Sequence, residues 1–310
     1  MDKHSKILVA GSNGMVGGAI VRNLKKQGYT NIICADRREV DMTQQNDVNN
    51  FFEKDKPEYV FLAAAKVGGI VANNTYPADF IKTNLQIEVN IIDACYKYKV
   101  KKLLFLGSSC IYPRNCPQPI KEEYLLTGEL EKTNEAYALA KIAGLKMCQF
   151  YNEQYGTDYI SCMPTNLYGT GDSYDLNNSH VLPALIAKIH TAKKNGDMEY
   201  TVWGTGKVMR EFLFVEDLAD ACVFLMNNYK GNQTINVGTG EDITIETLAK
   251  TIAKVLKFNG KIIYDPTKPD GTPRKLLDVS KIRDLGWRHK INLEEGIRIA
   301  YADYLLRYER

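Results

Sequence analysis

Three residues near the middle of the chain have the side chains and spacing needed to move a hydride to or from a carbonyl group. Tyr137 and Lys141 are four residues apart in a segment with helical periodicity, so their side chains project from one face. The phenol can protonate an alkoxide, and we expect the neighbouring ammonium to lower the phenol pKa from its usual ~10. Ser108 follows the apolar run Leu103–Leu106 and is placed to hydrogen-bond the carbonyl oxygen. Tyr-x-x-x-Lys pairs also occur by chance on helix surfaces, so this assignment needs a cofactor site beside it.

Two further acid/base residues exceed what hydride transfer alone requires. Cys110 lies two residues after Ser108, outside any apolar stripe, and the alternatives are a packed thiol or a disulfide with Cys116. A reducing compartment disfavours the disulfide. His180 precedes an expected helix, whose N-terminus would lower the imidazole pKa, and the alternative is a capping or surface histidine. These two residues point to chemistry beyond reduction.

A glycine-rich loop follows the first apolar run and opens the first helical pattern. Its glycines allow a tight turn and a close approach to a pyrophosphate, which would sit at the helix N-terminus. The strand before it and the helix after it favour a dinucleotide site over a plain turn. The loop has the spacing G-x-x-G-x-x-G and consists of Gly11, Ser12, Asn13, Gly14, Met15, Val16 and Gly17.

The end of the second apolar run carries charges that would read the cofactor ribose. Asp36 would accept hydrogen bonds from both ribose hydroxyls and favour NAD, whereas Arg37 and Arg38 would bind the 2′-phosphate of NADP. The sequence offers both possibilities, and a third is that these residues form a solvated charge run.

The elements that position these residues alternate between strands and helices in the first half of the chain. Short apolar runs of this kind, joined by helices, predict a right-handed, doubly wound parallel sheet of the Rossmann type. The expected strands are Lys6–Ala10, Asn31–Ala35, Tyr59–Ala63, Lys102–Leu106 and Asp158–Met163, and the expected helices are Val16–Gln27, Asp47–Lys54, Asp79–Lys99 and Glu135–Tyr155.

After Pro164 the pattern is less regular, which predicts a smaller α/β substrate-binding domain. We expect the Glu211–Phe214 run and the helix after it to return to the first sheet. The predicted division is therefore 1–166 with 211–237 for the dinucleotide-binding domain and 167–210 with 238–310 for the substrate domain. Two polar loops, Gly169–Ser179 and Pro266–Pro273, are expected to contact ligands, and Leu293–Arg307 is expected to form a packed helix.

Composition limits the partners. The 310 residues carry a formal charge of +3 with scattered Lys and Arg, which argues against a nucleic-acid surface. No run approaches the roughly 18 apolar residues of a membrane span. The seven cysteines form no C-x-x-C pair and no apolar signal region opens the chain, so we expect a cytoplasmic protein with reduced thiols.

Several longer strings make the chain resemble the GDP-L-fucose synthases, which are bifunctional 3,5-epimerase/4-reductases of the extended short-chain dehydrogenase group. The resemblance extends over essentially the whole chain, and these strings are more specific than the glycine loop. They are Leu62–Asn74 (LAAAKVGGIVANN), Leu106–Pro113 (LGSSCIYP), Met163–Gly169 (MPTNLYG), Trp203–Phe212 (WGTGKVMREF) and Lys268–Lys275 (KPDGTPRK).

The resemblance implies an activity and a set of roles. The substrate would be a GDP-linked 4-keto-6-deoxy sugar, with Cys110 as base and His180 as acid in the inversions at carbons 3 and 5. NADP(H) would serve the reduction at carbon 4, with Tyr137 as proton donor and Ser108 and Lys141 assisting. Besides the glycine loop, the cofactor site would comprise Asp36, Arg37, Asp41, Leu106, Lys141, Pro164, Asn166, Leu167 and His180, and the substrate site Lys188, Trp203, Arg210, Asp270 and Lys275.

This sequence departs from the family pattern at two of these positions. Asn13 stands where members can have an arginine that grips the 2′-phosphate, and Lys188 stands where a substrate-binding arginine is expected. Fold analogy also suggests a homodimer built on the helices around Asp79–Lys99 and Glu135–Tyr155.

Other functions remain as alternatives. A nucleotide-sugar 4-epimerase would use the same Ser, Tyr and Lys with tightly held NAD, and a simple 4-ketoreductase would also need no counterpart of Cys110 or His180. A 4,6-dehydratase would need an acidic pair where Ser109-Cys110 stands. A redox-sensing binding module would keep the glycine loop but usually lose the Tyr–Lys pair.

Overall fold

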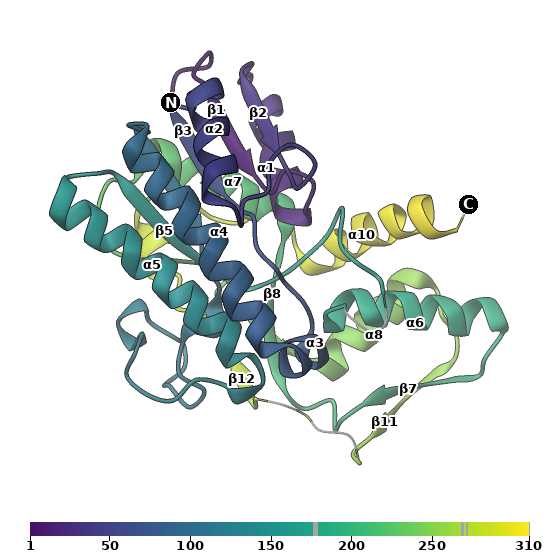
Figure 1. The fold of residues 1–310 in the computed structure, drawn as a ribbon. Helices are drawn as coiled ribbons and strands as arrows, with labels where there is room; N and C mark the ends of the chain where they lie inside the picture. The colour runs from purple at the N-terminus through teal and green to yellow at the C-terminus, as the bar shows by residue number, and fades with distance from the viewer. Residues whose placement is uncertain (176–178, 268–269, 271, 310) are drawn as a thin grey trace.

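The apolar runs of the first half form one parallel sheet. The computed structural model describes residues 1–175, 179–267, 270 and 272–309 (Figure 1). Six strands lie in the order β2-β1-β3-β4-β5-β9, and every neighbouring pair is parallel. These strands are β1 (Ile7–Ala10), β2 (Ile32–Ala35), β3 (Tyr59–Leu62), β4 (Lys102–Leu106), β5 (Tyr159–Pro164) and β9 (Ile235–Val237).

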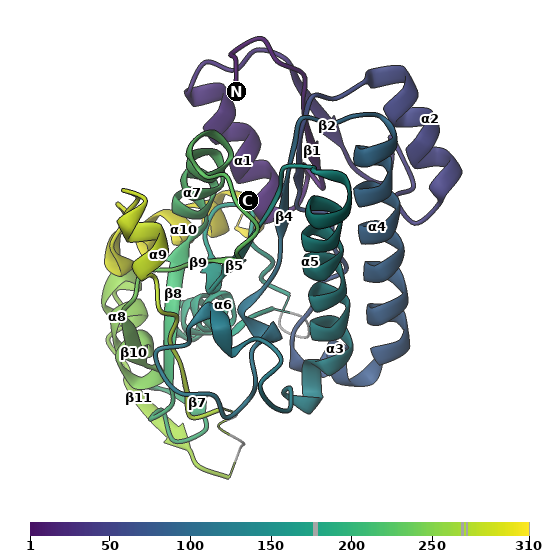
Figure 2. The ribbon, with the colours of Figure 1, turned by 90° about the vertical axis from the view of Figure 1, so that its left-hand side faces the viewer.

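Helices cover both faces of this sheet, which accounts for strands that are apolar throughout. Figure 2 shows α2, α4 and α5 on one side of the sheet and α1 and α7 on the other. The predicted strands and helices of the first half are confirmed, and no end differs by more than two residues. The helices are α1 (Met15–Lys26), α2 (Gln45–Asp55), α3 (Ile70–Thr75), α4 (Pro77–Lys97), α5 (Glu135–Tyr155) and α7 (Val215–Asn228).

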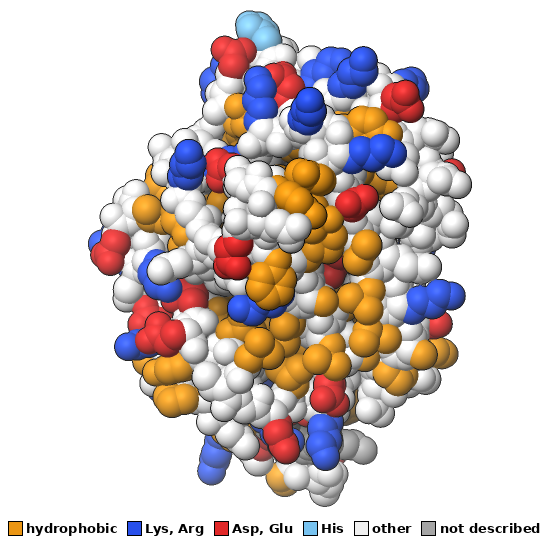
Figure 3. All heavy atoms as spheres, turned by 60° about the vertical axis from the view of Figure 1, so that its left-hand side comes forward, with side chains coloured by type: hydrophobic (Ala, Val, Ile, Leu, Met, Phe, Trp, Pro, Cys, Tyr) orange, Lys and Arg blue, Asp and Glu red, His pale blue; other side chains and the backbone are white. Residues whose placement is uncertain are grey.

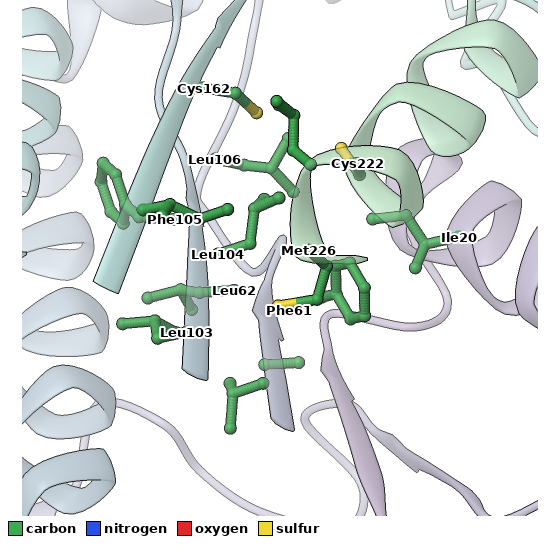
Figure 4. Close-up of a cluster of buried hydrophobic side chains, with 14 of the residues drawn as sticks. Ile20, Phe61, Leu62, Leu103, Leu104, Phe105, Leu106, Cys162, Cys222 and Met226 are labelled. Carbon is green, nitrogen blue, oxygen red and sulfur yellow. The ribbon is translucent and has the colours of Figure 1, made fainter. Parts of the chain in front are cut away.

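The first core lies on either side of the central strands. All five residues of β4 are buried, and successive side chains point to opposite faces of the sheet. Figure 4 shows Leu104 and Leu106 near Met226 and Cys222 of α7, with Phe105 directed away from that helix. Strand β4 is therefore fixed by packing on both faces, and so is the loop that follows it.

A second, smaller sheet corrects one prediction. Strand β8 does not return to the first sheet, because it pairs with β6 and β12 in parallel and with β10 in antiparallel orientation. The position beside β5 is taken by β9, whose three residues, Ile235, Asn236 and Val237, are all buried. The helix after β8 does return as predicted, since α7 packs on α1, β4 and β5. The strands concerned are β6 (Asn166–Tyr168), β8 (Met209–Phe214), β10 (Asp242–Thr244) and β12 (Arg274–Lys275).

The remaining elements surround the second sheet. Helices α6, α8 and α10 enclose a separate buried apolar cluster with Tyr168, Phe212 and Phe214. Figure 1 shows this group, with the β7–β11 pair, at the opposite end of the molecule from α2. The elements are α6 (Val181–Asn195), α8 (Ile245–Leu256), α9 (Ser280–Asp284), α10 (Leu293–Tyr308), β7 (Glu199–Trp203) and β11 (Lys261–Asp265).

The two apolar clusters support the proposed division into 1–166 with 211–237 and 167–210 with 238–310, which stays a proposal. Leu277, Ile282 and Trp287 belong to the first cluster although they lie in the second range. Within the described part of the chain, no helix is long and apolar enough to cross a bilayer.

Candidate active site

The glycine loop joins β1 to α1 in a shape that admits no side chain at two positions. Gly11 has φ +85°, and its N–H donates to the carbonyl of Ala35 at 2.8 Å. A Cβ on Gly11 would lie 2.7 Å from Ala64, and one on Gly17 would lie 2.1 Å from the carbonyl oxygen of Gly11. Gly14 occupies the N-cap of α1 and brings no side-chain acceptor, which leaves the first-turn N–H groups available to an anion.

The end of β2 carries the three charged residues expected to contact the cofactor ribose, and two of them form an ion pair with each other. Asp36 forms an ion pair with Arg38 at 2.8 Å, which holds the pKa of its carboxyl well below the usual range. The guanidinium of Arg38 therefore offsets the negative charge that would repel a 2′-phosphate, while Arg37 is exposed. Asp41 accepts hydrogen bonds from the backbone and hydroxyl of Thr43, so its carboxylate fixes the turn before α2.

Lys141 and Tyr137 lie on α5 above the end of β4, as their spacing predicts. The ammonium of Lys141 donates to the carbonyl oxygen of Leu106 at 3.0 Å and lies 5.8 Å from the centre of the Tyr137 ring. Ser108 lies two residues after Leu106, and its Oγ accepts from the N–H of Cys110 at 3.3 Å. The structure thus brings the hydride-transfer residues to the carboxyl end of β4.

The pKa of Tyr137 corrects an expectation. It is raised well above its ordinary value, chiefly because burial disfavours the phenolate and also because Cys110 and Glu88 lie near the ring. The Lys141 ammonium does not reverse this, since it is also paired with Glu88 at 3.1 Å. A phenol that keeps its proton suits a donor to an alkoxide.

Cys110 and His180 come from distant parts of the chain but share a neighbour, Lys275. Cys110 lies in the single turn Ser109–Ile111 and is 8% exposed; burial raises its thiol pKa, while Lys275 and Lys141 lower it. His180 is the N-cap of α6, and desolvation and Lys275 lower its pKa, in the expected direction. The charge of Lys275 therefore acts on both residues.

The predicted cofactor residues after β5 sit where the two sheets meet. Pro164 ends β5 beside Val237, and Asn166 begins β6 with Leu167 as the next residue. The Asn166 amide donates to the backbone oxygen of Glu211 at 2.8 Å. This junction faces the same ends of the parallel strands as the glycine loop.

The predicted substrate residues fall into two groups. The ammonium of Lys188 on α6 lies 4.8 Å from the centre of the Trp203 ring. Arg210 pairs in register with Lys275 across β8 and β12, and the charge of Asp270 acts on it. The Asp270 carboxylate accepts from the backbone and hydroxyl of Thr205, both at 2.7 Å, so it fixes that turn.

Parts of two predicted ligand loops lie outside the described residues, namely 176–178 of Gly169–Ser179 and 268, 269 and 271 of Pro266–Pro273. In the rest of the chain, no group of three or more His, Cys, Asp and Glu is arranged to hold a metal ion.

Two buried carboxylates near the site were missed by the sequence analysis. Glu88 faces Lys141 from α4, and Glu211 accepts backbone N–H groups from Gly240 at 2.7 Å and Leu277 at 3.0 Å. Both are at most 1% exposed. The signal for Glu88 was a carboxylate in α4 whose neighbours three and four residues later, Ile91 and Ile92, are apolar.

Comparisons with known proteins agree with this geometry. Residues 7–238 match the NAD dependent epimerase/dehydratase family. GDP-L-fucose synthase 1 of Arabidopsis thaliana is 58% identical over 304 residues, covering 98% of this chain and 94% of the relative. A GDP-6-OMe-4-keto-L-xylo-heptose reductase from C. jejuni has a TM-score of 0.94 at 40% identity, covering 99% of both chains. A GDP-L-fucose synthetase from Naegleria fowleri bound to NADP has a TM-score of 0.93 at 29% identity, covering 100% of this chain and 96% of that structure.

Proposed function

Because the chain belongs to the NAD dependent epimerase/dehydratase family and, within it, to the GDP-L-fucose synthases, we propose that it makes GDP-L-fucose from GDP-4-keto-6-deoxy-D-mannose. It inverts carbons 3 and 5 and then reduces carbon 4. The observation that carries this proposal is the presence of four groups, Tyr137, Lys141, Cys110 and His180, around the end of β4 and Lys275.

The epimerisation uses the two residues that a reductase lacks. The ketone at carbon 4 acidifies the hydrogens at carbons 3 and 5. In each inversion Cys110 as thiolate removes the proton and His180 as imidazolium delivers one to the opposite face, each step being worth about 10²–10⁴ in rate when well positioned. Between the two inversions the Cys110 thiol gives its proton to solvent and His180 takes one up. Burial raises the pKa of the Cys110 thiol, and the charges of Lys275 and Lys141 oppose that rise, which favours the thiolate.

The reduction uses the residues on β4 and α5. Bound NADPH supplies the hydride to carbon 4. Tyr137 gives its phenol proton to the developing alkoxide, Ser108 donates to the same oxygen, and Lys141 supports the charge that develops on the phenol. The raised pKa of Tyr137 keeps the donor protonated at neutral pH.

The residues present fit NADP(H), and this cofactor is also bound in the Naegleria fowleri relative. The cradle at Gly11 and Gly17, which a Cβ would fill, suits the pyrophosphate. Arg37, with Asp36 already paired to Arg38, suits the 2′-phosphate. Trp203, Lys188 and Arg210 are proposed to hold the GDP portion, Arg210 through its planar set of donors.

Assembly and location complete the proposal. Figure 3 shows apolar side chains gathered on the face that α4 and α5 present, where Val89, Tyr96, Leu139, Phe150 and Tyr155 are 41–59% exposed. An apolar face of this kind supports a homodimer through α4 and α5. A monomer mass by light scattering at micromolar concentration would contradict it. All seven cysteines are unpaired, which supports a cytoplasmic location.

The deciding experiment is the reaction of GDP-4-keto-6-deoxymannose and NADPH with the protein in deuterium oxide, with the product analysed by NMR. A fucose-configured product with deuterium at carbons 3 and 5 is expected. Oxidation of NADPH without deuterium at those carbons would leave only a reductase, and no reaction would reject this substrate.

The second candidate is reduction at carbon 4 alone. The observation that favours it is the near-complete structural match to the C. jejuni GDP-heptose reductase. The same experiment separates the two candidates, because only the epimerase step introduces deuterium from the solvent.

A further inference from the structure

Lys141 has a buried anionic partner that the reduction scheme does not use. Glu88 Oε1 on α4 lies 3.1 Å from the Lys141 ammonium on α5, and the two side chains are 1% and 2% exposed. Within the described chain, neither Oε1 nor Oε2 of Glu88 has a hydrogen-bond partner, so the ion pair is the only polar contact given for this carboxylate. An isolated carboxylate is not kept in such a place, so Glu88 depends on Lys141 and Lys141 on Glu88.

A glycine in α5 makes room for this pair. Gly144 is three residues after Lys141 and therefore on the same face of the helix. A Cβ on Gly144 would lie 2.7 Å from Glu88 Oε2 and 2.6 Å from the Phe105 ring. A side chain at this position would displace the carboxylate or the ring, so Glu88 can occupy its observed place only because residue 144 is a glycine.

The geometry also divides the donors of the ammonium. A lysine has three N–H groups. One is taken by the carbonyl oxygen of Leu106 at 3.0 Å, while Glu88 lies at ion-pair distance and holds the ammonium by its charge, so the other two N–H groups are not committed to a protein acceptor. Removal of Glu88 would free the ammonium to turn towards other acceptors.

We propose that Glu88 is a positioning residue for carbonyl reduction, which holds the Lys141 ammonium against Leu106 and the cofactor and sets the pH range in which Tyr137 donates its proton. This inference rests on the proposed reduction at carbon 4. The effect is expected in the second half of the reaction, because Glu88 contacts Lys141 directly, whereas Lys141 is only a minor cause among those that act on the pKa of Cys110.

The pH effect has a definite sign. The ionisable groups that face Glu88 are Lys141, Tyr137 and Cys148 on α5, and Cys110 also acts on the Tyr137 ring. Glu88 contributes to the raised pKa of Tyr137. Its replacement by a neutral amide makes ionisation of the phenol easier, so the basic limb of the pH profile for reduction moves to lower pH.

The test compares Glu88→Gln with the wild type and with Asp93→Asn. Asp93 is a matched control, because it lies on the same helix, five residues after Glu88. Its carboxylate also faces α5, where it accepts a hydrogen bond from Tyr151 at 3.0 Å. NADPH oxidation as a function of pH measures reduction, and deuterium exchange at carbons 3 and 5 without NADPH measures epimerisation.

For Glu88→Gln we expect kcat for reduction to fall about 10- to 100-fold, below the ~10²–10⁴ of a general acid, with the basic limb moved down. Exchange should stay within about twofold of the wild type. Glu88→Asp keeps the charge and should recover part of the reduction rate, and Asp93→Asn should leave the profile in place. Two results would overturn the inference. One is a basic limb that stays in place or moves to higher pH in Glu88→Gln, and the other is a parallel loss of reduction and epimerisation.

A folding measurement tests the pair without activity. In urea, Glu88→Gln should lower the unfolding midpoint of the wild type but not that of Lys141→Met, where the carboxylate has already lost its partner. Equal effects in both backgrounds would overturn the pairing. A wild-type protein that oxidises no NADPH would instead overturn the proposed function.

Discussion

Asp172 provides a stability switch that can be measured without any substrate. It lies in the loop between β6 and α6, which is bonded to α10: the N–H of Gly171 donates to Asp303 at 3.0 Å, and Arg307 donates to the backbone oxygen of Asp172 at 2.5 Å. The Asp172 side chain is 6% exposed, and its Oδ2 has no hydrogen-bond partner within the described chain. Burial raises the pKa of this carboxyl to about 7.

The size of the change in the free energy of unfolding follows from the difference between the pKa of Asp172 in the folded and unfolded states. The pKa of about 7 in the folded state lies well above the ordinary 3.8, so the folded state binds the proton more tightly than the unfolded state. The protein therefore loses stability as pH rises from about 4 to about 7, by roughly 4 kcal/mol in total at 1.36 kcal/mol per unit. The two units above pH 5 account for about 3 kcal/mol of this loss.

Asp172→Asn removes the titrating group while its amide oxygen keeps the hydrogen bond from the Ser173 N–H. Urea unfolding at about pH 5 and about pH 8.5 should show the variant gaining about 3 kcal/mol relative to the wild type between the two conditions. Asp197→Asn, an exposed position after α6, is the control and should show no such gain. A difference between Asp172→Asn and the wild type that is independent of pH would refute the reasoning.

Three substitutions test the roles assigned around β4 and α1. Tyr137→Phe should abolish reduction but retain proton exchange at carbons 3 and 5, measured by NMR in deuterium oxide; loss of both in a folded protein would contradict the division of roles. Cys110→Ala should stop that exchange, and a product still inverted at both carbons would show that another residue is the base. Gly17→Ala places a Cβ 2.1 Å from the Gly11 oxygen. Overpacking of about 1–3 kcal/mol there should weaken NADPH binding roughly 10- to 100-fold in fluorescence titration, and unchanged affinity would argue against the pyrophosphate site.

The sequence was sufficient where local pattern determines structure. The strand β4 and the helix α5 were predicted with their observed ends because one is a continuous apolar run and the other has a clear stop, Gly156 with φ +68°. The side chains of Tyr137 and Lys141 share a face for the same local reason.

Pairings between strands far apart in the chain could not be predicted as well from the sequence. Phe212–Phe214 is as apolar as a strand of the first sheet, yet β9 lies beside β5 and this run pairs with β6 instead. The pKa of Tyr137 depends on Glu88, which is 49 positions away in the chain and was not considered. Lys275 was assigned to the GDP portion on resemblance, whereas the fold also brings its charge to Cys110 and His180.

The junction between the two sheets determines which motions can admit a substrate. Thr165 alone separates β5 from β6; its N–H donates to Val237 of the first sheet, and the next residue, Asn166, is bonded to Glu211 of the second. A hinge at this point would expose buried hydrogen bonds, at about 1–3 kcal/mol each. A movement of the two sheets against each other at this point is therefore costly, so we expect entry and release of a nucleotide sugar to depend on the surface loops around the site rather than on a hinge between the sheets.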